Sequence, residues 1–328
     1  MVIILFLQTR NAFLRKNIAA VVVYAIVCGL ALSWLVTETI IPMLTTPVTI
    51  SFNLSVDLAN LAPIVNLLFQ ILITVLILFA VIHNGLDLVK KVSTGDVNYS
   101  HEKQVIRRFD LNQRIQHIWL LTTTFVLALT GFALMYYPAW GIYVAQAFGG
   151  IRNLIGIHLV AAFLLGVLIV YHFAFYGAQY IIGHARGNPV PLSIVMSRKD
   201  ITDFIKSMKY MLGRGDAPKY PKYDYAQKFD YWGIYWGMII LGVPGMFLWA
   251  YGYDFLNGVP FVFHTDEAML AVLFLMVFHF YQTHFNPRYF PMNKVFWTGK
   301  MSEKDMEKEH PMEMKRLELP VRESGSEK

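Results

Sequence analysis

Residues 156–173 read G-I-H-L-V-A-A-F-L-L-G-V-L-I-V-Y-H-F, and residues 263–280 read F-H-T-D-E-A-M-L-A-V-L-F-L-M-V-F-H-F. Each apolar stretch carries two histidines, spaced by 14 residues in the first and 15 in the second: His158 and His172, His264 and His279. At about 100° per residue, 14 steps fall roughly 40° short of four turns and 15 steps exceed them by roughly 60°. We therefore expect each pair near one face of its helix, about 21 to 22 Å apart along the axis.

Such a spacing puts one imidazole toward each surface of a hydrocarbon core about 30 Å thick. A titratable group inside a membrane is costly unless it is paired or bound. Haem iron held between imidazoles of facing helices fits two levels of histidine. The alternative is that these histidines are interfacial or core residues that donate to backbone carbonyls.

The composition indicates an all-α membrane protein. Hydrophobic residues make up 56% of the 328 and charged residues only 15%. Long charge-poor runs each reach the approximately 20 residues that cross a bilayer. The six predicted spans are 18–41, 63–87, 116–137, 154–182, 229–251 and 265–286. No small-residue cleavage site follows the first span, which predicts an anchor rather than a removed signal peptide.

Basic residues predict the orientation. Of the 28 Lys and Arg residues, all but Arg152 fall on the side that holds both termini. The positive-inside rule makes that side cytoplasmic, in a cytoplasmic (inner) membrane. The outward loops are then 42–62, 138–153 and 252–264. The net charge of +6 indicates contact with anionic membrane lipid, and no nucleic-acid-binding module is visible.

Cys28 is the only cysteine and lies in the first apolar segment. An intrachain disulfide, a C-x-x-C-H haem attachment and a thiolate metal site are therefore excluded. Any haem must be held by coordination and packing, which means a b-type haem.

The chain divides into unequal parts. Residues 1–100 carry two helices and a polar link, and residues 101–300 carry four helices with all the clustered histidines. The loop 185–225 contains apolar residues at helical spacing, which predict an amphipathic helix on the cytoplasmic surface or against a partner. The tail 301–328 is charge-rich and is expected to contact a partner or to fray.

His117 opens the third span and adds a further candidate ligand. Following the chain direction through the spans sorts the histidines by depth. The outer level holds His158 and His264. The inner level holds three candidates, His117, His172 and His279, among which composition and spacing do not choose.

The chain resembles the cytochrome b subunits of formate dehydrogenase and related quinone-linked membrane oxidoreductases. The resemblance covers roughly residues 101–320. Beside the paired histidines of the last span, it rests on the motifs R-I-Q-H-I-W (114–119), G-I-H-L-V-A-A (156–162), Y-D-Y-A-Q-K (223–228) and T-G-K-M-S…E-H-P (298–311).

The resemblance implies that the last four helices form a bundle holding two b haems. His117 and His279 would ligate the inner iron, and His158 and His264 the outer iron. It further implies a quinone pocket, for menaquinone or ubiquinone, beside the inner haem. Asp224 and Gln227 stand at the positions of its polar residues, although capping or surface exposure of Asp224 is an alternative.

The chain departs from the family pattern in several places. The two leading helices are extra, and Asp224 replaces an amide. The spacing of 15 in the last span is one residue longer, so either one partner is misassigned or the helix is irregular. His172 could ligate in place of His117, relay protons, or be satisfied within the core.

Other polar residues have simpler interpretations. Asp266 and Glu267 are expected in the first turn of the last span, where the helix dipole stabilises acids. His83 is expected at the membrane interface. The arginines near the third span could neutralise haem propionates or form a solvated flank: Arg107, Arg108 and Arg114.

Two classes of function follow. The first is an electron-transfer subunit that connects an external redox partner with quinone through two haems, in a larger hetero-oligomer. The partner on the outer face would be a multihaem cytochrome c or an iron–sulfur protein, because the chain carries no signature of a catalytic subunit. The second is a transporter or a non-redox structural anchor, although a transporter usually shows broken helices or two related halves.

Overall fold

The computed structural model describes residues 2–45, 61–96, 105–187 and 192–318. Six helices in these ranges are long and apolar enough to cross a membrane, which confirms the predicted all-α class with six spans. The chain is therefore a multi-pass membrane protein. The spans are Asn17–Ile40, Leu61–Thr94, Leu111–Met135, Ile151–Ala185, Tyr225–Tyr251 and Phe255–Phe285.

Several helices are longer than the apolar runs that predict them. Helices α3 (Leu61–Thr94) and α6 (Ile151–Ala185) contain 34 and 35 residues, or about 51 and 52 Å of helix. Both exceed the hydrocarbon core of about 30 Å, so part of each helix extends beyond it. Both helices continue through their polar last turns. Hydropathy marks only the apolar part of a helix, so it does not predict this extension.

The last span is composite. It consists of a short 3-10 segment (Phe255–Gly258), α9 (Val259–Phe274) and the π-helical segments η5 (Leu275–His279) and η6 (Tyr281–Phe285). It starts earlier than predicted, so Asp266 and Glu267 lie about two turns inside the helix. Their assignment to a first helical turn is wrong.

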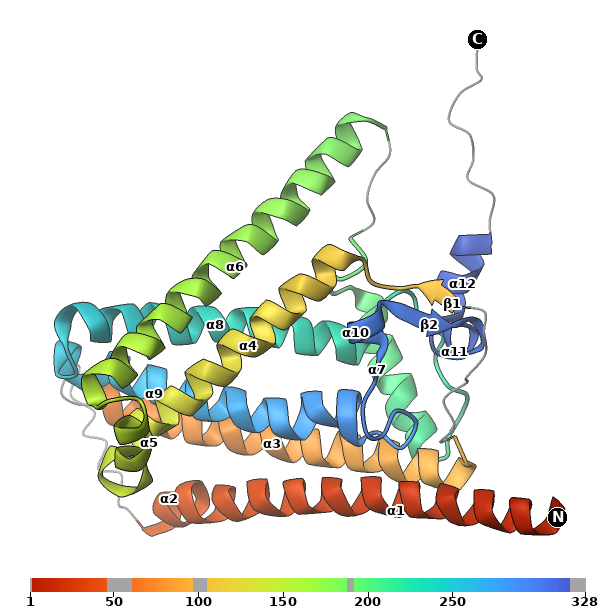
Figure 1. Ribbon diagram of the computed structural model, residues 1–328, viewed down its shortest axis with the longest axis horizontal. Coiled ribbons are helices and arrows are strands. Elements are labelled where there is room, and N and C mark those ends of the chain that lie inside the picture. The colour runs from red at the N-terminus through yellow and green to blue at the C-terminus, as the bar shows by residue number, and fades with distance from the viewer. Residues whose placement is uncertain (1, 46–60, 97–104, 188–191, 319–328) are drawn as a thin grey trace.

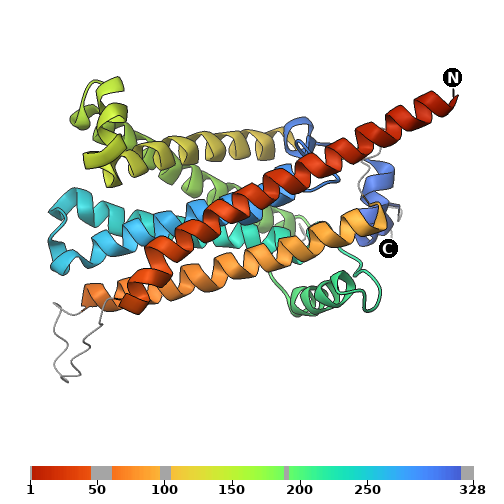
Figure 2. The ribbon, with the colours of Figure 1, turned by 90° about the horizontal axis from the view of Figure 1, so that it is seen from below.

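The helices pack as pairs (Figures 1 and 2). Helix α4 (Leu111–Met135) contacts α6, and α8 (Tyr225–Tyr251) contacts α9. The extra helices α1 (Val2–Leu35) and α3 contact each other and the last span, so they cover it on the side away from α6. A π segment (Val36–Ile40) and α2 (Ile41–Thr45) follow α1.

One buried stripe joins α3 to the last span. It repeats at intervals of three or four residues along α3, the spacing of one helical face: Val65, Phe69, Ile73, Ile77 and Ala80. Ile77 belongs to the main core cluster together with Tyr24 of α1 and Leu270 and Tyr281 of the last span. The two N-terminal helices therefore share a core with the histidine-bearing helix.

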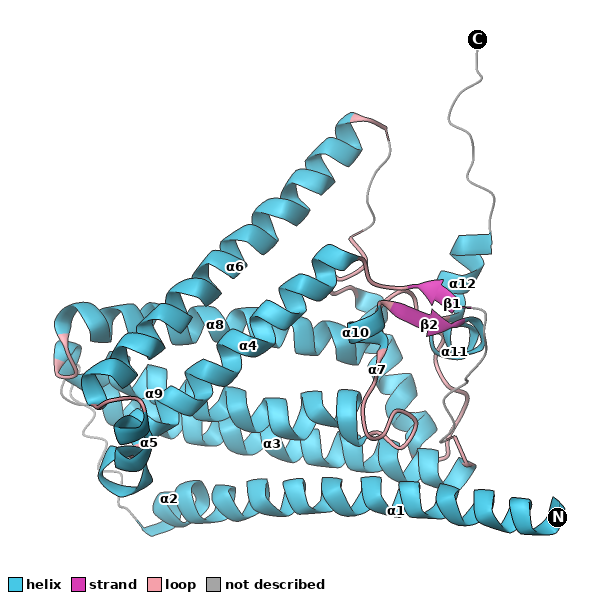
Figure 3. Ribbon diagram, in the orientation of Figure 1, coloured by secondary structure: helices cyan, strands magenta, loops and turns pink. Residues whose placement is uncertain are grey.

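Most of the polar secondary structure gathers at one end of the molecule, which we call the basic end. Strands β1 (Val105–Arg107) and β2 (Lys300–Ser302) pair antiparallel there and are the strands of the described residues (Figure 3). The helices beside them are α7 (Arg198–Met211), α10 (Val295–Thr298), α11 (Glu303–Glu309) and α12 (Pro311–Glu318). At the opposite end, the π segment Tyr137–Gly141 and α5 (Ile142–Ala147) connect α4 to α6.

The tail is folded as far as residue 318. Arg288 is buried and lies 2.7 Å from Asp305 and 3.0 Å from Glu309, which fastens α11 to the end of the last span. Gly299 adopts φ +74°, and a Cβ there would lie 2.5 Å from the Phe109 carbonyl. The position therefore requires glycine. The expected fraying does not apply to these residues.

Helix α7 forms as predicted, but its buried face is mixed, because Met211 is buried and Phe204 packs on the core beside two acidic residues. Asp200 and Asp203 are buried, and Asp200 forms an ion pair of 2.9 Å with buried Lys228 of α8. Ile201 and Ile205 are exposed. The helix therefore docks through both acidic and apolar side chains, and it leaves Ile201 and Ile205 available for the membrane surface.

The tail should loosen in acid, because His310 is buried. Its Nδ1–H donates to the Pro221 carbonyl at 2.7 Å, and burial, helped by Arg108, lowers its pKa from 6.5 to about 3. Between these values the unfolded segment binds a proton that the folded one excludes, so stability falls as the pH falls. We expect the amide protection factors in 303–318, which are corrected for the intrinsic pH dependence of exchange, to fall over this window. His310→Gln should flatten that dependence; equal pH dependence in both proteins would contradict the assignment.

Candidate functional site

The structure brings the predicted histidines together as two cross-helix pairs. His117 of α4 and His279 of η5 have ring centres 6.5 Å apart with 29° between the planes, and we call them the basic-end pair. His158 of α6 and His264 of α9 have ring centres 6.2 Å apart with 76° between the planes, and we call them the opposite-end pair. Each pair lies within the span of its helices.

These separations match two imidazoles that share one metal ion. A metal–imidazole bond is about 2.0–2.1 Å, and with about 1.1 Å from ring nitrogen to ring centre the two centres lie about 6.2–6.4 Å apart. No group of three or more His, Cys, Asp or Glu residues that could hold a metal occurs in the described part of the chain. A haem, whose porphyrin already supplies four nitrogens, requires only the two that each pair offers.

The opposite-end pair is oriented by oxygen partners on Nδ1. His158 Nδ1 lies 2.8 Å from the Thr130 hydroxyl, and His264 Nδ1–H donates to the Leu241 carbonyl at 2.9 Å. Pro244 lies inside α8, three residues after Leu241, and has no backbone N–H to donate to the preceding turn. With Nδ1 engaged, Nε2 is the nitrogen left for a metal, which is the usual arrangement of ligating histidines.

Two glycines make room for this pair. A Cβ at Gly131 of α4 would lie 3.2 Å from the His158 ring, and one at Gly245 of α8 would lie 3.0 Å from the His264 ring. Both distances are tighter than ordinary contact, so larger residues would displace the imidazoles. The glycines therefore form a cradle for the two rings.

In the basic-end pair the carboxylate of Asp230 on α8 accepts from His279 Nδ1 at 2.5 Å. This contact leaves Nε2 of His279 free for a metal. His117 has a buried Nδ1 without a hydrogen-bond partner among the described residues and packs against Phe296, with ring centres 5.1 Å apart. Asp230 escaped the sequence analysis, although an acid just inside an apolar span was a usable signal.

The π-helical segment accounts for the spacing of 15 in the last span. Segment η5 ends on His279, and the next residue, Phe280, donates its N–H to Leu275, five residues back. A π turn accommodates one extra residue, so the long spacing still brings His279 opposite His117. Of the two predicted explanations, the structure supports the irregular helix.

A large cavity connects the two pairs. Its volume is about 3190 Å³, and its lining includes all four paired histidines. Pockets for drug-sized ligands are about 300–1,000 Å³, so this cavity has room for more than one large group. It runs between α4, α6, α8 and the last span and reaches the polar residues of the basic end.

His172 stands apart from both pairs. Its Nδ1 lies 2.7 Å from Gln116 Oε1, its Nε2 lies 2.6 Å from the Tyr231 hydroxyl, and its ring packs on Tyr176 and Tyr235. The amide oxygen only accepts, so Nδ1 donates and Nε2 accepts from the tyrosine. Of the alternatives for His172, the structure therefore favours a residue satisfied within the core.

Asp224 and Gln227 form a capping box at the start of α8. The Asp224 carboxylate accepts from the Gln227 backbone N–H at 2.8 Å. Asp224 therefore caps the helix, which was the alternative to a quinone-binding role. Both residues also line the cavity, and Arg108 donates to Gln227 Oε1 at 3.3 Å. Burial raises the pKa of Asp224 above its ordinary value, against the opposing effects of that hydrogen bond and the Arg108 charge.

The structure also gives the positions of the other polar residues singled out in the sequence. His83, expected at the interface, is buried, with 3% of its surface exposed. Glu267 is buried on α9, and its Oε1 lies 2.9 Å from the position of a Cβ on Gly237 of α8. Arg107, Arg108 and Arg114 all line the cavity, and Arg108 is buried.

No protein-family model and no curated protein sequence matches this chain. The interpretation of the site therefore depends on its own geometry. That geometry consists of two imidazole pairs at metal-bridging distance, a shared cavity, and oxygen partners on three of the four Nδ1 atoms.

If His172 is a core residue, its tyrosine partner must contribute to stability. Tyr231→Phe leaves Nε2 of a buried imidazole without a donor, which costs about 1–3 kcal/mol. Tyr171→Phe, which removes a hydroxyl bonded to Asn112 at an exposed position, should change stability by less than about 0.5 kcal/mol. Thermal unfolding in detergent measures both. Equal stability of the Tyr231 variant and the parent would contradict this role of His172.

Proposed function

We propose that this protein is a di-haem b-type cytochrome subunit that carries electrons between an external redox partner and a membrane quinone. The observation that carries the proposal is the presence of two cross-helix imidazole pairs, at 6.5 and 6.2 Å, near opposite ends of one cavity. His117 and His279 would hold one iron, and His158 and His264 the other. The bound haems would supply reversible one-electron chemistry.

The protein's own part is to orient the ligands and adjust their basicity. The Asp230 carboxylate increases the electron density of the His279 imidazole, and the Leu241 carbonyl does so more weakly for His264. The two iron sites therefore have different environments, which supports two different redox potentials. The cavity between the pairs is lined mostly by apolar side chains.

The quinone site is proposed at the basic end, where polar groups and the basic-end pair adjoin the same cavity. Gln227 could donate its amide to a quinone carbonyl, and Asp224 could exchange protons with water, which its raised pKa favours. Quinone reduction consumes two electrons and two protons. Menaquinone and ubiquinone both fit this chemistry.

The basic end is proposed to be cytoplasmic, in a cytoplasmic membrane, since nearly all Lys and Arg lie there. The redox partner, a multihaem cytochrome c or an iron–sulfur protein, would then dock outside, near the opposite-end pair. Moving one charge across the full field corresponds to about 2.3 kcal/mol per 100 mV. The same path serves quinone reduction or, in reverse, quinol oxidation.

A transporter or a structural anchor is the alternative class. Proton transport calls for hydrogen-bonded chains of titratable groups rather than imidazole pairs at a metal-bridging distance. The pairing of His158 with His264 has no separate explanation in that class. A cavity end lined by Lys and Asp residues is compatible with an electron-transfer subunit and with a transporter, so it does not distinguish the two classes of function.

The ligand assignment predicts selective loss of one haem. His158→Ala or His264→Ala should remove the opposite-end haem and leave the other in place, because the pairs are about 20 Å apart along the helices. His117→Ala or His279→Ala should do the reverse. Haem content and the reduced-minus-oxidised spectrum of the purified protein measure the loss.

His184→Ala is the matched control, since His184 is an exposed histidine on the same helix as His158. It should retain both haems. Retention of both haems by the His158 and His264 variants would overturn the assignment of the opposite-end pair.

The quinone assignment predicts a separate defect. The double variant Asp224→Asn, Gln227→Leu should lose quinone-dependent oxidation or reduction of the haems while both haem spectra stay intact. Stopped-flow absorbance with a soluble quinol measures this rate. Asp216→Asn changes an exposed carboxyl before α8 that does not line the cavity, and it should leave the rate unchanged. A normal rate in the first variant, or a loss in the second alone, would move the pocket elsewhere.

A further inference from the structure

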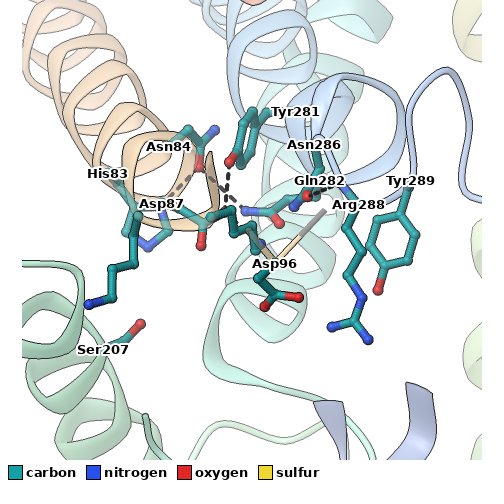
Figure 4. Close-up of polar contacts among 12 residues, drawn as sticks. His83, Asn84, Asp87, Asp96, Ser207, Tyr281, Gln282, Asn286, Arg288 and Tyr289 are labelled. Atoms are coloured by element: carbon teal, nitrogen blue, oxygen red, sulfur yellow. Dashed lines mark hydrogen bonds and ion pairs between the residues drawn. The ribbon is translucent and has the colours of Figure 1, made fainter. Parts of the chain in front are cut away.

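The buried stripe of α3 becomes polar where it meets the π segment of the last span. Asn84 is fully buried and His83 nearly so, and Asp87 lies one turn further on. Figure 4 shows these three side chains on α3 beside Tyr281 and Gln282 of the last span. A buried polar cluster between two membrane helices is costly unless its groups are satisfied, so its contacts are informative.

Asn84 is the centre of the cluster. Its Nδ2 donates to the Val277 carbonyl, inside η5, at 3.0 Å. Its Oδ1 accepts from His83 Nδ1 at 2.9 Å and from Gln282 Nε2 at 3.4 Å. One side chain of α3 therefore holds a carbonyl two residues before His279 and an amide three residues after it.

Asp87 holds the next turn. Its carboxylate accepts from the Tyr281 hydroxyl at 2.7 Å and from Lys91 at 2.7 Å. Tyr281 is fully buried and packs on Tyr24 of α1, with ring centres 4.8 Å apart. Both N-terminal helices thus contact the Tyr281 side chain, two residues after His279.

The cluster is also anchored away from the last span. His83 donates through Nδ1 to the Asn84 amide oxygen, so its Nε2 accepts from the Tyr225 hydroxyl at 2.6 Å. Tyr225 lies at the start of α8 and is 3.1 Å from Ser207 of α7. The chain of hydrogen bonds therefore ties α7, α8 and α3 to one carbonyl of the π segment.

We propose that α1 and α3 hold the π segment in register and thereby position His279 opposite His117, with Asn84 and Asp87 as positioning residues. The inference rests on the proposed function, because its readout is the iron site of the basic-end pair. A π segment converted to regular α-helix would shift the following residues by one position, or about 100° around the helix. His279 would then no longer face His117.

The angle between the imidazole planes offers a direct readout. In low-spin ferric haem with two imidazole ligands, nearly parallel rings give a rhombic EPR spectrum, and nearly perpendicular rings give a strongly anisotropic one with a large maximal g value. The basic-end pair, at 29°, belongs to the first kind and the opposite-end pair, at 76°, to the second. The two sites are therefore observed separately in one sample.

The test is Asn84→Leu in the full-length, haem-loaded protein. It removes the donor to Val277 and preserves the side-chain volume. We expect the rhombic signal to shift its g values or to be lost, and the midpoint potential of that haem to change, while the strongly anisotropic signal stays unchanged. Gln70→Leu is the matched control, an amide-to-apolar change three to four turns earlier on α3, and should alter neither signal.

Tyr281→Phe is the second variant, in case Asn84→Leu does not accumulate in the membrane. It removes only the hydroxyl bonded to Asp87 and should shift the same rhombic signal by a smaller amount. An unchanged rhombic signal and potential in these variants, with two haems present in the parent, would overturn the positioning role alone. Absence of haem from the parent protein would instead overturn the proposed function.

Discussion

The structure depends on the requirement that imidazoles buried between membrane helices find a partner. Hydrocarbon offers no hydrogen-bond or metal partner, so the nitrogens of the four half-buried imidazoles inside the spans must find one in the protein or in a bound group. Three of them have one nitrogen satisfied by an oxygen, and in each pair the ring centres lie at a separation that matches two imidazoles on one metal ion.

The residues around the two histidine pairs hold the imidazoles close together. Gly131 and Gly245 allow the neighbouring helices to come close to the opposite-end pair. At the other pair the support is polar, with Asp230 on one side of His279 and the Asn84 cluster of α3 on the other. The long helices and the folded tail enclose the cavity that both pairs share.

Much of this organisation could be predicted from the sequence, because apolar length and helical spacing are local properties. The six spans and the pairwise grouping of His158 with His264 follow from them. The π turn before His279, the burial of His83 and the docking of α7 through Asp200 could not be predicted, because they depend on contacts between helices far apart in sequence. The choice of His117 over His172 required the hydrogen bonds of Gln116 and Tyr231, which spacing does not encode.

The most direct measurement is the EPR spectrum of the oxidised, purified protein, with haem quantified per chain. Two six-coordinate b haems in these two pairs predict two low-spin ferric signals in equal amounts. One should be rhombic, from His117 and His279, and one strongly anisotropic, from His158 and His264. A protein purified with its native membrane lipids that shows no low-spin haem signal would contradict the account.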